Sequence, residues 1–65
     1  MLYHLTADDG RVGQIASRDE FIVEATEEFK HYVGRYAPEA LRAAQRKGFS
    51  WQLISVATRL TPVLQ

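Results

Sequence analysis

The side chains that could perform acid–base, nucleophilic or metal chemistry are few and poorly grouped. Asp8 and Asp9 are adjacent carboxylates, but they precede Gly10 in a sequence typical of an exposed turn, where water solvates both. The two histidines, His4 and His31, lie far apart and the chain has no cysteine, so no metal-ligand spacing occurs. The serines and glycines form neither a nucleophile elbow nor a phosphate-binding loop. The sequence therefore predicts a protein that is not an enzyme, with no catalytic residue, metal site or cofactor.

Arginine and aromatic side chains are the more informative group, because they are the usual anchors of protein interfaces. Three phenylalanines, three tyrosines and one tryptophan are many for a chain of 65 residues, and so small a core cannot hide all of them. The tyrosines and the tryptophan carry polar atoms that favour partial exposure. We therefore predict a partner-binding surface made of Tyr32, Arg35, Tyr36, Arg42, Arg46 and Trp51.

The charged residues are divided unevenly along a chain whose formal net charge is zero. Residues 1–28 hold seven acids and two bases, a net charge of −5, and residues 29–65 hold six bases and one acid, a net charge of +5. This asymmetry predicts an acidic face and a basic face. Two interpretations stay open: the halves attract each other, within the fold or across a dimer, or the basic half meets an anionic partner.

Length and composition define the class of protein. The chain is long enough for one small domain, residues 1–65, and its hydrophobic fraction of 46% and charged fraction of 25% are ordinary for a globular protein. No apolar run approaches the ~20 residues of a membrane-spanning helix, and the N-terminus lacks a signal-peptide pattern. We expect a cytoplasmic protein without a membrane partner, and a homodimer is one way to complete so small a core.

Turn residues mark two of the expected elements. The dipeptide Asp9-Gly10 lies between short β-prone runs, which predicts a β-hairpin over residues 2–16. Pro38 suits the first turn of a helix, and the residues that follow it predict a helix over residues 38–47.

The segment between these elements has the pattern of a longer helix. Ser17 and Glu20 match a capping box, and apolar residues then recur at helical spacing, which predicts a helix over about residues 18–36. An alternative makes residues 21–23 a third strand and starts the helix at Thr26.

Residues 49–65 decide the fold, and their pattern fits two structures. β-Branched residues between Ile54 and Thr58 favour a strand, whereas the apolar spacing from Leu53 to Leu64 fits a helix. Because a lone hairpin is marginally stable, we favour a strand that pairs with the first one. The predicted fold is thus α+β: an N-terminal β-hairpin, two helices and a C-terminal strand that completes a small, three-stranded antiparallel sheet.

The helical alternative would create a helix-turn-helix. Residues 40–59 resemble that motif, because Ala44 is followed four residues later by Gly48 and then by apolar Phe49 and Ile54. The resemblance implies a recognition helix over about residues 50–59. The side chains that it would bring to bases or to the phosphate backbone are Trp51, Gln52, Ser55 and Arg59, with Arg42, Arg46 and Lys47.

Two functions follow from these features. The first is a small binding protein that regulates or inhibits a protein partner by covering its surface, a role typical of phage accessory proteins and small bacterial regulators. The second is a DNA-binding transcriptional regulator that uses residues 40–60, with nucleic acid on the basic C-terminal half.

Overall fold

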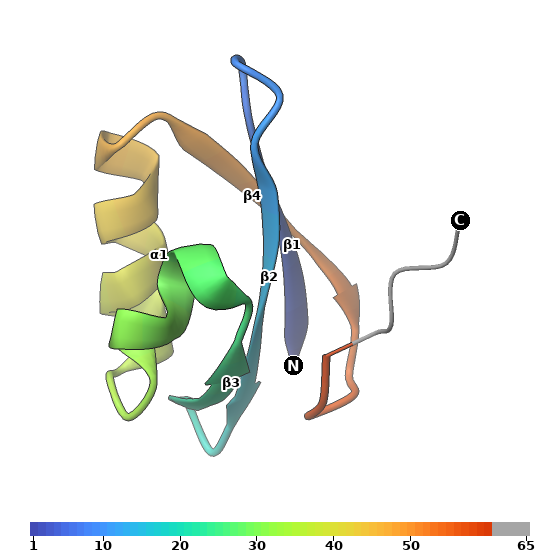
Figure 1. Cartoon of the computed structure of the whole chain (residues 1–65). Helices are drawn as coiled ribbons and strands as arrows, with labels where there is room; N and C mark the ends of the chain where they lie inside the picture. Colours follow the sequence, from blue (N-terminus) through green and yellow to red (C-terminus); the bar gives the residue numbers. More distant parts are fainter. Residues whose placement is uncertain (61–65) are drawn as a thin grey trace.

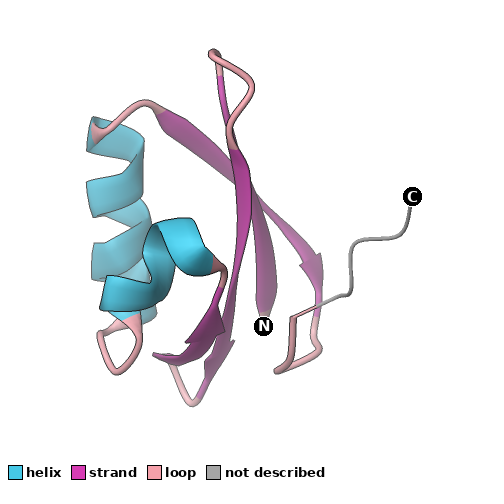
Figure 2. Cartoon of the chain, viewed as in Figure 1, coloured by secondary structure: helices cyan, strands magenta, loops and turns pink. Residues whose placement is uncertain are grey.

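A four-stranded antiparallel sheet and two helical segments make up the computed structural model, which describes residues 1–60. The elements in chain order are β1 (Leu2–Ala7), β2 (Val12–Arg18), β3 (Phe21–Ala25), the 3₁₀ helix η1 (Glu27–Tyr32), α1 (Ala37–Arg46) and β4 (Phe49–Ser55). The strand order across the sheet is β3-β2-β1-β4, so the first and last strands are neighbours. Both helical segments cover one face of the sheet (Figure 1, Figure 2).

The small antiparallel sheet backed by helices confirms the predicted α+β class. The hairpin predicted over residues 2–16 is formed by β1 and β2. The helix predicted over residues 38–47 is α1, which has Pro38 in its first turn. The predicted C-terminal strand is β4, which pairs antiparallel with β1.

The helix predicted over residues 18–36 is wrong, and the sheet has four strands rather than three. Residues 21–25 form β3, and the helical segment η1 starts only after Thr26, close to the alternative interpretation. Asp19 and Glu20 lie in the turn between β2 and β3, so the expected capping box does not form. The aromatic and β-branched residues at the start of β3 prefer the pleated surface that pairing with β2 provides.

The helix-turn-helix interpretation is also wrong, because residues 49–55 form β4. Gly48 follows the end of α1, and its φ of +99° is a conformation that favours glycine. The chain then enters the sheet beside β1, and Phe49 is buried in the core. No recognition helix is present over residues 50–59.

The core lies between the sheet and the helical segments, with Phe29 of η1 at its centre. The Phe29 side chain is 2% exposed, and its ring lies edge to face with that of Phe49, with 4.8 Å between the ring centroids. Phe29 also lies directly on the backbone of β2 at Gly13. A Cβ atom added to Gly13 would be 2.7 Å from Cδ2 of Phe29 and 2.9 Å from Oγ1 of Thr26. The rest of the core comprises Leu5, Ile15, Ile22, Ala25, Tyr32, Ala37, Ala40, Leu41 and Ala44.

The turn between β2 and β3 contains two residues in an unfavourable conformation. Asp19 has a φ of 54° and Glu20 a φ of 72°. Positive φ at both central residues is the pattern of a type I′ turn, in which asparagine followed by glycine is preferred.

The double substitution Asp19→Asn, Glu20→Gly is expected to raise the free energy of unfolding by about 1 kcal/mol. Glycine removes the strained β-carbon at position 20, and asparagine is among the residues preferred at the first central position of this turn. Urea unfolding followed by circular dichroism measures the change. The control is Asp19→Ala, which keeps a β-carbon at positive φ and is expected to give no gain. An equal gain from the control would show that backbone strain is not the cause.

Candidate functional site

The outer face of α1 and the segment that leads into this helix form a groove with a volume of about 310 Å³. We call it the basic groove, and its lining residues are Tyr32, Arg35, Glu39, Ala40, Arg42, Ala43 and Arg46. Four of the six predicted partner-binding residues are therefore brought together in one place: Tyr32, Arg35, Arg42 and Arg46.

One wall of the basic groove is a stripe of side chains on α1. Glu39, Arg42, Ala43 and Arg46 recur at intervals of three or four residues, which places them on one side of the helix. Arg42 and Arg46 are a like-charged pair at i, i+4, and such a pair destabilises an isolated helix by a few tenths of a kcal/mol. Helix stability therefore does not explain why both positions are arginine.

Tyr32 and Arg35 form the other wall. Tyr32 is the last residue of η1, and its ring is stacked with that of Phe29, with 6.1 Å between the centroids. The Arg35 N–H donates to the Tyr32 carbonyl at 2.9 Å, and the Ile22 N–H donates to the Arg35 carbonyl at 2.9 Å. The backbone of Arg35 is thus fixed against β3, while its side chain remains exposed at the basic groove.

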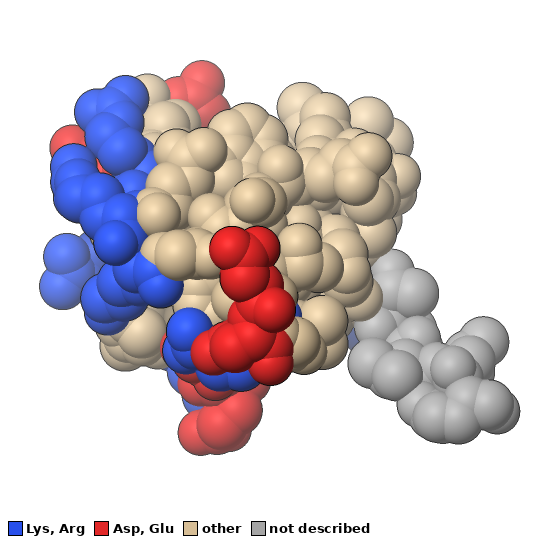
Figure 3. Space-filling view, turned by 90° about the horizontal axis from the view of Figure 1, so that it is seen from above, with Lys and Arg blue, Asp and Glu red and all other residues tan. Residues whose placement is uncertain are grey.

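The three arginines of the basic groove form no ion pair with any residue in the described part of the chain. The ion pairs there join Asp9 to Arg11 at 2.7 Å, Glu28 to Arg11 at 3.2 Å, and Glu27 to Lys30 at 3.6 Å. Of these, only the exposed Glu27–Lys30 contact links the acidic N-terminal half to the basic C-terminal half. Figure 3 shows that lysine and arginine side chains gather along one side of the molecule, the side of the helices in Figure 1. Attraction between the two halves therefore leaves most of the basic charge uncompensated.

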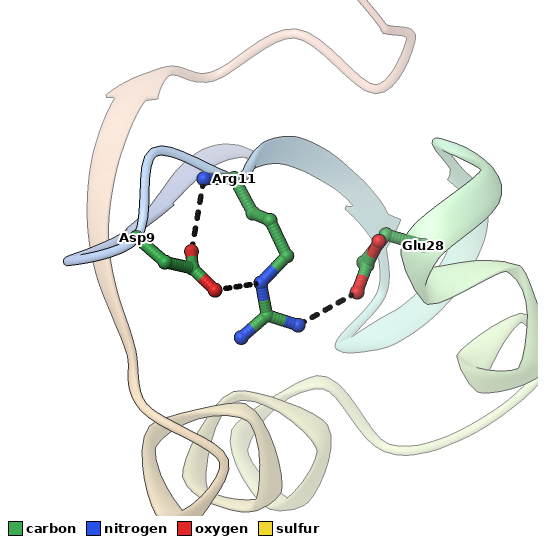
Figure 4. A network of polar contacts seen from close by, with 3 residues as sticks. All are labelled: Asp9, Arg11 and Glu28. Carbon is green, nitrogen blue, oxygen red and sulfur yellow. Dashed lines mark hydrogen bonds and ion pairs between the residues drawn. The ribbon is translucent and has the colours of Figure 1, made fainter.

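Arg11 forms ion pairs with two carboxylates, and its role is structural (Figure 4). Its side chain joins Asp9 at the hairpin turn to Glu28 on η1, and its guanidinium lies 4.8 Å from the centroid of the Phe49 ring. The N–H of Arg11 donates to the Asp9 carboxylate at 3.1 Å, and this bond is the main cause that lowers the pKa of Asp9. The carboxylates nearest to Arg11 thus hold the hairpin turn against η1.

Comparisons of this chain with protein-family models, with curated proteins and with solved structures found no match. Within residues 1–60, no group of three or more histidine and acidic side chains is placed to hold a metal ion. No helix in that part of the chain is long and apolar enough to cross a membrane.

Tyr36, which was predicted to belong to the partner-binding surface, lies outside the basic groove. It immediately precedes α1, and its ring packs against that of Phe21, with 5.8 Å between the centroids. The Glu20 carboxylate beside its hydroxyl group raises the pKa of Tyr36. Its contacts tie the start of α1 to the outer edge of β3, through a bridge between Phe21 and Tyr36.

Trp51 also lies apart, on β4. Its ring packs edge to face on that of Tyr3, with 5.4 Å between the centroids. A second groove, with a volume of about 260 Å³, lies here between α1 and β4, and it is lined by Tyr3, Pro38, Leu41, Arg42, Gln45 and Trp51. Arg42 lines both grooves, so α1 separates the basic groove from the one beside Trp51.

Sequence reasoning missed Glu39, Ala40 and Ala43 as parts of the basic groove. The helical spacing of Glu39 and Ala43 with Arg42 and Arg46 could have identified the first and last of these. Ala40 belongs to the buried core as well as to the groove, and helical periodicity alone predicts only its core position.

Proposed function

We propose that this chain is a non-enzymatic binding protein that regulates or inhibits a protein partner by covering an acidic segment of it. The observation that carries the proposal is the basic groove, in which Arg35, Arg42 and Arg46 converge without any ion pair among the described residues. Arginine is suited to this role because its planar guanidinium can form paired hydrogen bonds with a carboxylate.

The composition of the groove favours a protein segment over a polyphosphate chain. Ala40 and Ala43 provide a small apolar surface, and the Tyr32 ring lies beside them, so an apolar side chain of the partner has a place to pack. The isoelectric point of about 6.7 also differs from the strongly basic values typical of nucleic-acid-binding domains.

The proposed regulation by covering a surface is based on the basic groove, which can bind one segment of a partner. A groove of this kind supplies affinity and specificity for one segment of the partner, and occupation of that segment excludes other binding proteins from it. We propose the cytoplasm as the compartment, because a chain of this size without cysteine makes no use of the disulfides that stabilise small secreted domains.

Anisotropy titrations test the proposal with two fluorescein-labelled probes, a glutamate-rich peptide that contains one leucine and a mixed-sequence DNA duplex. We expect the peptide to bind at low salt and to bind more weakly at physiological salt, since screening weakens exposed charge pairs. The double variant Arg42→Glu, Arg46→Glu is expected to raise the peptide Kd at least about tenfold, because two attractive contacts become repulsive.

The matched control is Arg18→Glu, Arg59→Glu, which makes the same change in net charge at two exposed arginines outside the basic groove. It is expected to change the peptide Kd far less. An equal loss in both double variants would mean that net charge rather than the groove binds the peptide. Tighter binding of the duplex than of the peptide would replace the protein partner with a nucleic acid, and no binding of either probe at low salt would remove the groove as a binding site.

A further inference from the structure

The two edge strands of the sheet, β3 and β4, differ in whether their outer sides are paired with other backbone. At the β3 edge, the Ile22 N–H donates to the Arg35 carbonyl at 2.9 Å, and the Gly34 N–H donates to the Ile22 carbonyl at 2.8 Å. The connection between η1 and α1 therefore pairs with the outer side of β3. At the other edge, β4 pairs with β1 and with no other strand in residues 1–60. One edge of the sheet is thus closed and the other is open.

The stretch Phe49–Leu53 of β4 lacks the features that usually prevent an open edge from pairing. Natural edge strands are protected by charged residues, by proline or by bulges. None of the seven residues of β4 is charged, and none is proline. The register with β1 shifts only near the end of β4, at Ile54, so the stretch Phe49–Leu53 forms a regular ladder.

β4 also exposes large apolar side chains. Trp51 is 39% exposed, Leu53 46% and Ile54 48%. Trp51 and Leu53 lie opposite Leu5 and Tyr3 of β1, so they share the sheet face that carries the helices. The contact with Tyr3 holds the Trp51 ring in place beside the open edge.

We infer that β4 pairs with β4 of a second copy of this chain, forming a continuous antiparallel sheet across a twofold axis. In this arrangement the twofold axis passes beside Trp51, the midpoint of the regular stretch Phe49–Leu53. Each Trp51 then lies opposite the Trp51 of the second copy. Phe49 then lies opposite Leu53, and Ser50 opposite Gln52. Apolar residues face apolar ones on one side of the sheet, and polar residues face polar ones on the other.

Charge favours a second copy as the occupant. A twofold interface brings each residue close to its own counterpart or to near neighbours, so a charged strand would repel itself. β4 is uncharged in a chain in which a quarter of the residues are charged, and the formal net charge of zero adds no long-range repulsion between copies. An acidic or basic partner segment would find no counter-charge on this strand.

This inference does not depend on the proposed function, because no residue of β4 lines the basic groove. The test is analytical ultracentrifugation over a concentration series. We expect the unmodified chain to be a dimer and Leu53→Lys to raise the dimer Kd at least about tenfold, because the lysine would be placed against Phe49 of the second copy. The control is Val12→Lys, an exposed apolar residue on β2 away from the open edge, and it should remain dimeric.

A second measurement tests the register, using the fact that the chain has no cysteine. Ser50→Cys and Gln52→Cys chains are mixed and oxidised, and we expect cross-linking between the two variants to be faster than within either alone. Circular dichroism confirms that each variant is folded. A monomer at every concentration, or a Leu53→Lys chain as dimeric as the control, would overturn the inference. A dimer without the preferential cross-link would overturn the register in which Trp51 lies on the twofold axis.

Discussion

Gly13→Ala is expected to lower the free energy of unfolding by about 3 kcal/mol, the upper part of the range for overpacked cores. The added Cβ would overlap the ring of Phe29 and lie 2.9 Å from Oγ1 of Thr26. Neither neighbour can withdraw easily, because Phe29 is enclosed by the core and Thr26 Oγ1 accepts a hydrogen bond from the Gln14 N–H at 3.0 Å. A domain of this length has a total stability of only about 3–10 kcal/mol, so much of it would be lost.

Urea unfolding monitored by circular dichroism measures this loss. The matched control is Gly10→Ala at the tip of the hairpin, where an added Cβ meets no atom within 4 Å but the backbone has a φ of +93°. The control therefore contains conformational strain without overlap, and its expected cost is about 1 kcal/mol. If Gly13→Ala cost no more than Gly10→Ala, the close contact between β2 and Phe29 would not be a stability determinant.

Phe29→Ala is expected to cost about 3–5 kcal/mol, which is enough to unfold a large part of the population at room temperature. The substitution removes the ring that contacts Phe49 and Tyr32 and leaves a cavity between the sheet and η1. Thermal unfolding and the dispersion of amide resonances in NMR spectra report the loss. Phe21→Ala is the control: its side chain is 51% exposed, and we expect a cost below about 1 kcal/mol.

The two sites are expected to be coupled, since the Gly13→Ala overlap is an overlap with Phe29. In a Phe29→Leu background, which keeps an apolar side chain but removes the outer ring atoms, Gly13→Ala should cost clearly less than it does in the unmodified chain. Equal costs in the two backgrounds would indicate that Thr26 or the β2 backbone, rather than Phe29, resists the added methyl group.

Elements marked by local turn chemistry were predictable from the sequence. The Asp9-Gly10 turn, the proline in the first turn of α1 and Gly48 at its end each require a backbone conformation that only a few residue types favour. The choice of a strand for residues 49–55 depended on a tertiary argument, namely that the hairpin needs a further strand. Pairing between β1 and β4 confirms that argument.

The helix predicted over residues 18–36 failed because a β-bulge reproduced helical spacing. Ser17 pairs with Ile22 and Ala16 pairs with Glu24, so Val23 is an extra residue in β3. The bulge lets Ile22 and Ala25 both face the core although they are three positions apart, which a regular strand would forbid. The turn before β3 contains no glycine, so no signal in the sequence indicated the positive φ values at Asp19 and Glu20.

The candidate site was predictable only where its residues are brought together by local structure. Arg42 and Arg46 share a helix face whenever α1 forms, so their proximity follows from local structure. Tyr32 and Arg35 join them only because η1 and the segment after it lie beside α1, which is a tertiary arrangement. Trp51 was placed on the same surface because its residue type suits interfaces, but β4 carries it to the other side of α1.

The strand order also has a consequence for how the chain acquires its fold. During synthesis β1, β2 and β3 leave the ribosome before β4, so β1 has one unpaired edge until the last strand arrives. Ala7 pairs with Phe49, which closes a long loop and is entropically costly until the core contacts of Phe49 are also made. The step that joins β4 to β1 is therefore expected to limit the rate of folding, and the incomplete sheet is the species most prone to aggregate before that step.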